Sequence, residues 1–383
     1  NMKKIINAYK NKKVVAITVL VVLMAVLLLL KLSVAVCEYV FARGISRGYL
    51  RFVGLINVYL PFSIFEMLCI VAVLFVLFTI VKCICERKNK KAVINRVLTL
   101  ILAVFSVVNL YIITVGMTYN RKPMQLNVES YTLKDSEFVD IYEFLAQDYS
   151  NIEKDFKKEN GLVKSPYTFE QLSDMICKEF GKLDSYFNKV KTRAKPILFS
   201  GIMSNFGILG ITFAPTAEAN VNIDAPQQLW AFSIAHEFAH INGVMSERDA
   251  NILAFYVLYN SGNNYLKLCA YDNYLSEIST VVLLYNEQTF KDIFVKLPQS
   301  YSDCATFLNN FWLEQQQNGF NKIGNFFNNI YLKLSGVADG TNNYIVPSDP
   351  IITDDKNEFD RPTIIYNLNT IQAIMAQEYF SSK

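Results

Sequence analysis

Three long apolar runs dominate the first 117 residues of the chain. They cover about residues 14–36, 62–81 and 97–116. A helix needs about 20 apolar residues to cross the hydrocarbon core of a bilayer. The pattern therefore predicts a multi-pass membrane protein, with three transmembrane helices in residues 1–117 and a globular part in residues 118–383.

The segment between the first two runs, residues 37–61, is amphipathic. It carries Arg43, Arg47 and Arg51 at four-residue spacing, which places them in one stripe on a helix. Such a segment is typical of a helix that lies in the membrane interface. The second run contains Glu66, and a carboxylate inside a transmembrane segment usually marks a functional residue. Because Glu66 lies near the end of the run, a solvated or capping role is favoured.

Basic residues gather before the first run and between the second and third runs: Lys3, Lys4, Lys10, Lys12 and Lys13, then Lys82, Arg87, Lys88, Lys90, Lys91 and Arg96. Segments rich in Lys and Arg stay on the cytoplasmic side of a membrane. We therefore expect a cell-membrane protein with a cytoplasmic N-terminus and an extracytoplasmic C-terminal domain. The net charge of only +3 gives no indication of nucleic-acid binding, and seven scattered cysteines do not form a disulfide framework.

From residue 118 the composition becomes that of a globular protein. Residues 133–158 and 168–192 have helical spacing, and Thr168 with Gln171 forms a capping box at the start of the second segment. After residue 264 the pattern is helical almost throughout, with breaks at Pro298, at Gly336 to Pro350 and at Pro362.

Extended segments lie between these helical regions. Short runs occur at 196–200 and 208–215, and residues 218–224 alternate apolar and polar side chains, which predicts a half-exposed strand. Residues 335–360 are rich in Gly, Asn, Asp and Pro, which predicts a loop. The fold class expected for residues 118–383 is therefore α+β, mostly helical with a small sheet.

The chemistry of this domain centres on His236-Glu237-Phe238-Ala239-His240. The chain has only two histidines, and both lie here. On a helix, which Pro226 would open and Gly243 end, positions i and i+4 share a face. His236 and His240 can then offer nitrogens to one metal, in the spacing of zinc peptidases. The alternative is an amphipathic helix with two incidental histidines.

A catalytic zinc takes three protein ligands and leaves one position for water. Ser246 begins a capping box with Asp249, so a second helix is expected from there to about Tyr259. Glu247 and Asp249 are the candidates for the third ligand. Asp249 fits the role of capping partner, and Glu247 is the favoured ligand, although both acids also suit a helix N-terminus.

In this interpretation Zn²⁺ activates water, and Glu237 is the general base that takes its proton. An oxyanion donor is also needed, and the candidates are Tyr271, Tyr274 and Tyr331, although the sequence favours a packing role for each of them. The strand 218–224 comes just before the helix that carries His236 and His240, which we call the metal helix. This strand is expected to bind an extended peptide by β-augmentation. Asn220, Asn222 and Asp224 would share one of its faces, where core-edge packing is an equal alternative.

The stretch Glu247-Arg248-Asp249-Ala250-Asn251 resembles the gluzincin metallopeptidases, in which the histidine motif is followed by Glu-x-x-x-Asp or Glu-x-x-Ala-Asn. More widely, the chain resembles the domain of unknown function 3810 family of bacterial membrane proteins, which are similar to zinc peptidases preceded by three spans. The matching stretches are Pro61-Phe62-Ser63, Tyr119-Asn120-Arg121-Lys122-Pro123, Glu218-Ala219-Asn220-Val221-Asn222, the metal motif through Asn251, and Tyr331-Leu332-Lys333 with Gly336 and Gly340.

This resemblance implies a zincin-like (gluzincin) domain and a hydrolase of the metalloprotease class. Two positions depart from the family pattern. Ala214-Pro215-Thr216 stands where a Pro-Phe-Thr run is expected, and Asp249 stands where Glu is usual. Neither departure removes a proposed ligand.

The function expected from the sequence is a membrane-anchored zinc metallopeptidase that hydrolyses peptide or protein substrates outside the cytoplasm. An intramembrane protease is excluded, because the apolar stretch around His236 is too short to span and Glu247, Arg248 and Asp249 follow closely. The alternative is a non-catalytic, zinc-containing membrane module for binding, interaction or sensing. The sequence does not indicate the oligomeric state.

Overall fold

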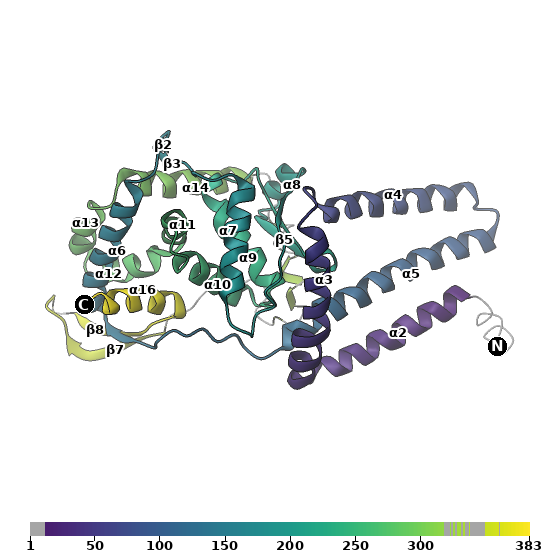
Figure 1. Ribbon diagram of the computed structural model, residues 1–383, viewed down its shortest axis with the longest axis horizontal. Helices are drawn as coiled ribbons and strands as arrows, with labels where there is room; N and C mark the ends of the chain where they lie inside the picture. Colours follow the sequence, from purple (N-terminus) through teal and green to yellow (C-terminus); the bar gives the residue numbers. More distant parts are fainter. Residues whose placement is uncertain are drawn as a thin grey trace.

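The computed structural model describes residues 12–317, 349–359 and 361–383, and between them residues 322, 325, 328–330, 332, 333 and 337. Figure 1 shows a mostly helical domain with three long helices projecting from one side. The C-terminus lies at the end of the domain farthest from these helices.

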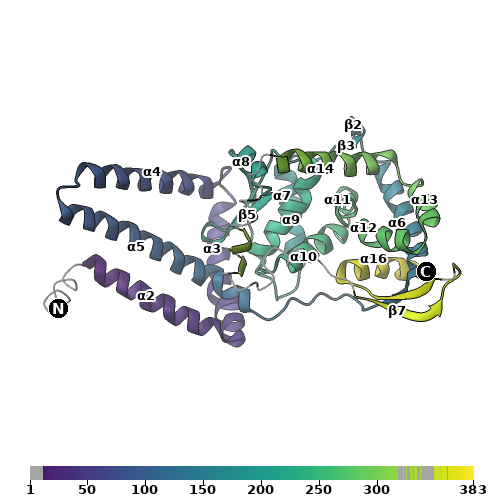
Figure 2. The ribbon, with the colours of Figure 1, turned by 180° about the vertical axis from the view of Figure 1, so that it is seen from behind.

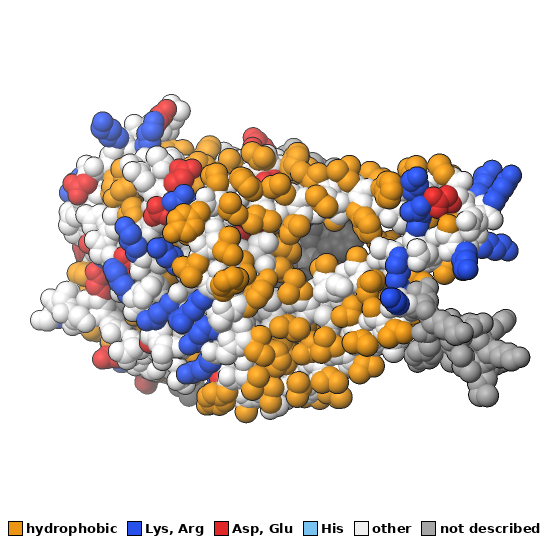
Figure 3. All heavy atoms as spheres, turned by 45° about the vertical axis from the view of Figure 1, so that its right-hand side comes forward, with side chains coloured by type: hydrophobic (Ala, Val, Ile, Leu, Met, Phe, Trp, Pro, Cys, Tyr) orange, Lys and Arg blue, Asp and Glu red, His pale blue; other side chains and the backbone are white. Residues whose placement is uncertain are grey.

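The three projecting helices are α2 (Lys12–Lys31), α4 (Ile64–Cys85) and α5 (Lys90–Thr114). Each is long and apolar enough to cross a membrane, which confirms the three predicted apolar helices. Figure 3 shows hydrophobic side chains over their surfaces and basic side chains at the tip where α4 joins α5. The first helix ends at Lys31 rather than at residue 36, because the chain there turns into the connecting segment.

That connecting segment consists of a π-helix, Val36–Ser46, and α3, Arg47–Asn57. It lies across the domain-side ends of the projecting helices (Figure 1). The arginine stripe faces the domain: the Arg47 guanidinium donates to the Ser185 and Tyr186 carbonyls at 3.0 and 2.9 Å. Arg51 donates to the Asn188 carbonyl at 2.7 Å. The stripe therefore joins the amphipathic segment to residues 185–188.

A three-stranded sheet lies beside this junction. Its order is β4 (Ala194–Pro196), β6 (Glu218–Val221), β5 (Gly210–Phe213), with β4 parallel and β5 antiparallel to β6. β6 is the central strand and all four of its residues are buried. The predicted strand at 218–224 is therefore confirmed for Glu218–Val221, but the prediction that it is half-exposed is wrong.

The polar residues of β6 are buried because the start of α4 provides their partners. Glu218 accepts hydrogen bonds from the backbone N–H groups of Ile64 and Phe65, both at 2.8 Å. Ser63 donates to the Asn220 side chain at 2.6 Å. An alternating pattern usually indicates a strand with one face toward solvent. In β6, the polar face of the strand instead binds a helix N-terminus.

The solvated role predicted for Glu66 is wrong, because its side chain is buried, whereas the carboxylate does accept backbone N–H groups at the start of α8 (Ser200–Asn205). The carboxylate accepts from the backbone N–H groups of Leu198 and Phe199, both at 3.0 Å. Nearby, the fully buried Lys195 ammonium donates to the Asn57 carbonyl at 2.9 Å and to that of Leu60. The first turn of α4 and the loop before it are thus fixed to the sheet.

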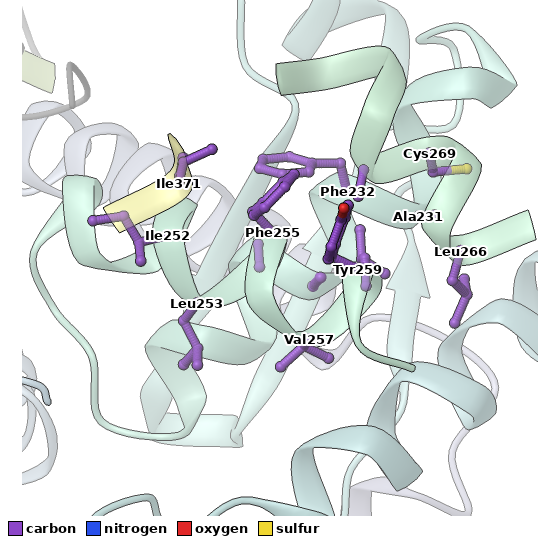
Figure 4. Close-up of a cluster of buried hydrophobic side chains, with 14 of the residues drawn as sticks. Ala231, Phe232, Ile252, Leu253, Phe255, Val257, Tyr259, Leu266, Cys269 and Ile371 are labelled. Atoms are coloured by element: carbon purple, nitrogen blue, oxygen red, sulfur yellow. The ribbon is translucent and has the colours of Figure 1, made fainter. Parts of the chain in front are cut away.

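The body of the domain is helical, and its helices are α6 (Phe138–Glu153), α7 (Phe169–Lys182), α9 (Trp230–Ile241), α10 (Glu247–Tyr259), α11 (Asn264–Tyr274), α12 (Ser276–Tyr285), α13 (Glu287–Phe294), α14 (Gln299–Gln317) and α16 (Thr370–Ser381). Phe232 of α9, Phe255 of α10 and Leu266 of α11 belong to one buried cluster (Figure 4). Burying one such side chain contributes about 1.5–3 kcal/mol.

Two predicted helices are shorter than expected. The capping box of Thr168 and Gln171 is confirmed, but α7 ends at Lys182 and not at 192. The following residues are held by the metal helix instead, since the Asn188 backbone N–H donates to the Asn242 carbonyl at 3.1 Å. The segment 133–158 forms a short strand and a 3₁₀ turn before α6 begins at Phe138, and α6 ends at Glu153.

A second sheet lies far from the projecting helices, beside α16 (Figure 2). It has the order β1 (Thr132–Lys134), β8 (Pro362–Asn367), β7 (Asp349–Lys356). The predicted loop 335–360 is therefore wrong for residues 349–356, whose Ile351 and Ile352 pair with Ile365 and Ile364 of β8. Most of residues 335–348 lie outside the described part of the chain. A two-stranded hairpin, β2 (Lys158–Glu159) and β3 (Leu162–Val163), completes the described strands.

Candidate metal centre

The metal helix α9 ends where the sequence predicts, but it begins at Trp230 and not at Pro226. Pro226 precedes a 3₁₀ turn, Gln227–Leu229, that continues into α9. At the other end Gly243 has φ +94°, and the Val244 N–H reaches the Ala239 carbonyl at 3.1 Å while the Gly243 N–H reaches that of His240 at 3.0 Å. This is the glycine-terminated helix end known as the Schellman motif. It turns the chain sharply enough for α10 to return against α9.

The second helix, α10, also begins where predicted. The Ser246 hydroxyl accepts from the Asp249 backbone N–H at 3.3 Å, so Ser246 is its N-cap and Glu247 its first residue. Because α10 packs against α9, a side chain in this first turn reaches the histidine face. The structure brings Glu247 to that face. Asp249 lies along a different cavity, with Met124 and Leu368.

Three ligand atoms converge at this point. The His236 Nε2 lies 3.1 Å from the His240 Nε2 and 3.1 Å from a Glu247 carboxylate oxygen, which is 3.3 Å from the His240 Nε2. Two ligands of a tetrahedral zinc, each about 2.0–2.1 Å from the metal, are about 3.3 Å apart. The spacing of these donors therefore fits a zinc ion, and His236, His240 and Glu247 are the one such group in the described part of the chain.

The other nitrogen of each histidine has an acceptor. The His236 Nδ1 lies 2.8 Å from the Asn251 side-chain oxygen, and the His240 Nδ1 lies 2.8 Å from the Val244 carbonyl. An acceptor at Nδ1 places the proton there and leaves the Nε2 lone pair available to a metal. Asn251 is thus a supporting residue to which sequence reasoning assigned no role. Its spacing was a signal, because it follows Glu247 by four residues on the same helix.

The carboxylate of Glu237 is buried beside these ligands. The Thr212 hydroxyl of β5 lies 2.7 Å from its Oε2 and 2.9 Å from its backbone carbonyl. A Cβ atom at Gly210 would lie 2.4 Å from the Glu237 Oε1, so β5 can pass this closely only with glycine there. Thr212 and Gly210 were also missed, because nothing in the sequence indicates which strand lies over α9.

Burial and mutual contact shift the pKa values of these groups. Burial alone would lower the pKa of His240, but the Glu247 carboxylate beside it raises that pKa to about 9. Burial alone would raise the pKa of Glu247, but the histidines hold it well below its usual range. Burial raises the pKa of Glu237, against the opposing effect of His236 and His240. The shifts of His240 and Glu247 both come from the attraction between the imidazole and the carboxylate, and a divalent cation can replace the proton in such a pair.

A cavity of about 860 Å³ extends over the centre. One wall is formed by the metal helix and the opposite wall by β5 and the residues before it. A third wall comes from Tyr111 and Val115 at the end of α5 and from Tyr119 just after it. The centre thus opens into a space large enough for several residues of a peptide.

Residues 41–346 match the family described as "Protein of unknown function (DUF3810)". The chain belongs to this family. The match begins in the π-helix after the first apolar helix and includes every ligand of the candidate centre. No curated protein and no solved structure matches the chain.

In this DUF3810 protein two of the three predicted oxyanion donors, Tyr271 and Tyr274, do not line the cavity. The Tyr271 hydroxyl donates to Asp148 at 2.7 Å, and Tyr274 packs against Phe232 and Phe255. Neither lines the cavity, and Tyr331 lies outside the described residues. The tyrosines that do line it are Tyr111 and Tyr119.

Proposed function

We propose that this DUF3810 protein is a membrane-anchored zinc metallopeptidase with a zincin-like (gluzincin) domain, which hydrolyses peptide bonds of peptide or protein substrates. The observation that carries the proposal is the convergence of the His236, His240 and Glu247 donor atoms at 3.1–3.3 Å, with Glu237 buried beside them. The Nδ1 acceptors at Asn251 and Val244 support it, because they prepare both histidines for coordination.

His236, His240 and Glu247 would hold the zinc ion. When bound, zinc supplies a Lewis acid for the scissile carbonyl and lowers the pKa of water toward 7. Glu237 accepts a proton from the attacking water and transfers it to the departing amine nitrogen. Thr212, which lies 2.7 Å from the Glu237 Oε2, orients this carboxylate.

Strand β5 takes the substrate-binding role first expected of residues 218–224. β6 has neighbours on both sides, so it has no edge to offer, whereas β5 is an edge strand of the described sheet and lines the cavity. An extended peptide added to that edge would run past Glu237, which nearly touches Gly210. In this arrangement backbone hydrogen bonds supply much of the affinity, so specificity depends on the cavity walls.

The site is proposed to lie outside the cytoplasm. The basic residues before α2 and around the loop joining α4 to α5 favour a cytoplasmic location for those two ends, and the domain extends from the opposite ends (Figure 1). This topology makes the protein a multi-pass cell-membrane protein with an extracytoplasmic catalytic domain.

The alternative, a non-catalytic zinc-containing module for binding or sensing, has less support. A structural zinc site closes with four protein ligands. Among the described residues the cluster contains three donors, and the chain has no further histidine. An open fourth position facing a cavity is the arrangement of a catalytic site.

Metal analysis and peptide cleavage test the proposal together. The purified full chain should contain equimolar zinc, Glu247→Ala should lose it, and the matched variant Asp249→Ala should keep it. Glu237→Gln should keep zinc and lose cleavage of a peptide library. A wild-type protein without zinc, or cleavage by Glu237→Gln at the wild-type rate, would refute the proposed function.

A further inference from the structure

Helix α3 binds the domain through one of its faces. That face carries Arg47 and Arg51, which donate to the loop before β4. It also carries Asn57, whose side chain donates to the carbonyls of residues 216 and 217, both at 3.0 Å. Leu50, which lies on the same face, is only 2% exposed. The domain therefore covers this side of α3 along its whole length.

The opposite face of α3 is apolar and uncovered. It consists of Phe52, Leu55 and Ile56 with Tyr59 just after the helix, and these side chains are 65%, 53%, 54% and 82% exposed. Positions i, i+3, i+4 and i+7 lie on one side of a helix. Because the domain covers the other side, this apolar face of α3 points to the side from which α2, α4 and α5 project (Figure 1).

A second exposed apolar patch, the α8 patch, lies beside the start of α4. It consists of Leu198, Phe199 and Ile202, which are 85%, 52% and 57% exposed. The Glu66 carboxylate accepts from the Leu198 and Phe199 backbone N–H groups at 3.0 Å. Because Glu66 lies in the first turn of α4, and α4 is apolar enough to cross a membrane, the α8 patch is held at the level where this helix would leave the hydrocarbon core.

Basic side chains lie next to these apolar surfaces. Arg43 of the π-helix, Lys122 after α5, and Lys189 and Lys191 in the loop that α3 binds are all exposed. Lys122 donates to the hydroxyl of Tyr39, also of the π-helix, at 2.8 Å. Figure 3 shows a row of basic side chains along the border between the apolar helices and the domain. Lysine, arginine and tyrosine beside an apolar face match the boundary between phosphate headgroups and acyl chains.

We propose that the apolar face of α3 and the α8 patch bind a phospholipid surface, so that the domain lies directly against the bilayer. Their side chains enter the acyl chains nearest to the headgroups, and the basic residues meet the phosphates. A lipid surface fits because both apolar surfaces continue those of helices able to cross a membrane. Tyr111 and Val115 at the end of α5 line the cavity, so this seat holds the metal centre next to the membrane surface. The proposal does not depend on catalysis at that centre.

Fluorine NMR of the full chain in lipid nanodiscs tests the proposal. Trifluoromethyl-phenylalanine is placed at Phe52 on α3, at Phe199 in the α8 patch, or at Leu284 on α12 as the matched control. Leu284 is 66% exposed, against 65% for Phe52, and α12 lies far from the projecting helices (Figure 1). The nanodiscs contain phosphatidylethanolamine and phosphatidylglycerol. Two relaxation agents are compared: a phospholipid with a nitroxide at the headgroup end of its acyl chain, and a water-soluble gadolinium chelate.

At positions 52 and 199 the lipid nitroxide should increase the fluorine relaxation rate several-fold more than the gadolinium chelate does, and at position 284 the order should be reversed. A gadolinium effect as large at 52 and 199 as at 284 would overturn the proposal, by showing that these surfaces lie in water. Protection from both agents would also overturn it, by showing that protein, such as a second copy of the chain, covers them. The measurement uses neither zinc nor cleavage, so its failure is distinct from a failure of the proposed function.

Discussion

Gly210 has no side chain, and this leaves room for the carboxylate of Glu237, the proposed general base. A Cβ atom there would lie 2.4 Å from the Glu237 Oε1 and 2.6 Å from its Cγ, closer than packed atoms approach. Gly210→Ala should therefore displace the Glu237 carboxylate while leaving His236, His240 and Glu247 in place. We expect peptide cleavage to fall by about 100-fold or more, the range of a lost general base, and zinc content to remain equimolar.

The matched control for this substitution is Gly181→Ala on α7. A Cβ atom at Gly181 meets nothing within 4 Å, so this variant should keep both zinc and activity. If Gly210→Ala cleaves the peptide library at the wild-type rate, then Glu237 is not held as proposed. If it loses zinc as well, the substitution disturbs the ligands and not the base alone.

The proton on His240 makes zinc affinity depend on pH. In the metal-free protein the Glu247 carboxylate raises the pKa of His240 to about 9, above the ordinary value of 6.5. Zinc binds the neutral imidazole, so below pH 9 each zinc that binds must displace a proton. We expect the affinity to rise by up to about tenfold per pH unit, or about 1.4 kcal/mol, between pH 6.5 and 9.

Chelator-buffered zinc titrations of the metal-free protein at several pH values would measure this slope. Zinc affinity should rise and not fall with pH. A raised pKa of His240 means that its proton stabilises the metal-free fold below pH 9 and competes with the metal there. An affinity that does not change between pH 6.5 and 9 would contradict the proposed pairing of His240 with Glu247.

Single elements show which features a sequence pattern can predict. The end of the metal helix and both ends of α10 were predicted correctly, because Gly243 and Ser246 are local signals. The environment of β6 was not predicted correctly, because the partners of Glu218 and Asn220 come from residues 63–65. Alternation along a strand shows that two faces differ, but not whether water or another polypeptide segment meets the polar one.

The buried carboxylate of Glu218 can be tested as the cap of α4. It binds the Ile64 and Phe65 N–H groups and accepts from the Thr216 hydroxyl at 2.7 Å. Glu218→Ala would leave these donors buried without an acceptor, at about 1–3 kcal/mol for each group. We expect a clear fall in the thermal unfolding midpoint of the full chain in detergent, and a smaller one for Glu218→Gln, which keeps one acceptor oxygen. Equal midpoints for wild type and Glu218→Ala would show that the cap adds no stability.

At the scale of the molecule, the three apolar helices and the domain form one structure and not two parts joined only by a linker. Lys195, Glu218 and Asn220 of the sheet are fully buried against residues 57–65. The sequence predicts the two parts but not this junction, because residues more than 130 positions apart in the chain form it. The way in which the apolar helices meet the sheet therefore had to come from the structure.

Arg121 connects this junction to the metal centre, and it offers a test of that connection. Its guanidinium pairs with Glu38 of the π-helix at 2.9 Å and donates to the Gly243 carbonyl, at the end of the metal helix, at 3.2 Å. Both members of the ion pair are buried, with side chains 4% and 0% exposed. Burial alone would raise the pKa of Glu38, but Arg121 and Arg43 hold it at about 2.

Arg121→Ala should destabilise the protein by about 3–5 kcal/mol, because it leaves a buried carboxylate with only the more exposed Arg43. It should also weaken zinc binding, since the turn that ends α9 loses a hydrogen bond. Glu38→Gln is the matched comparison: it removes the charge of the pair but leaves the contact between Arg121 and Gly243, so it should lower the thermal midpoint with a smaller change in zinc affinity. If both variants change stability and zinc affinity in the same proportion, Arg121 acts only through the ion pair, and the membrane segment and the metal helix are not coupled through Gly243.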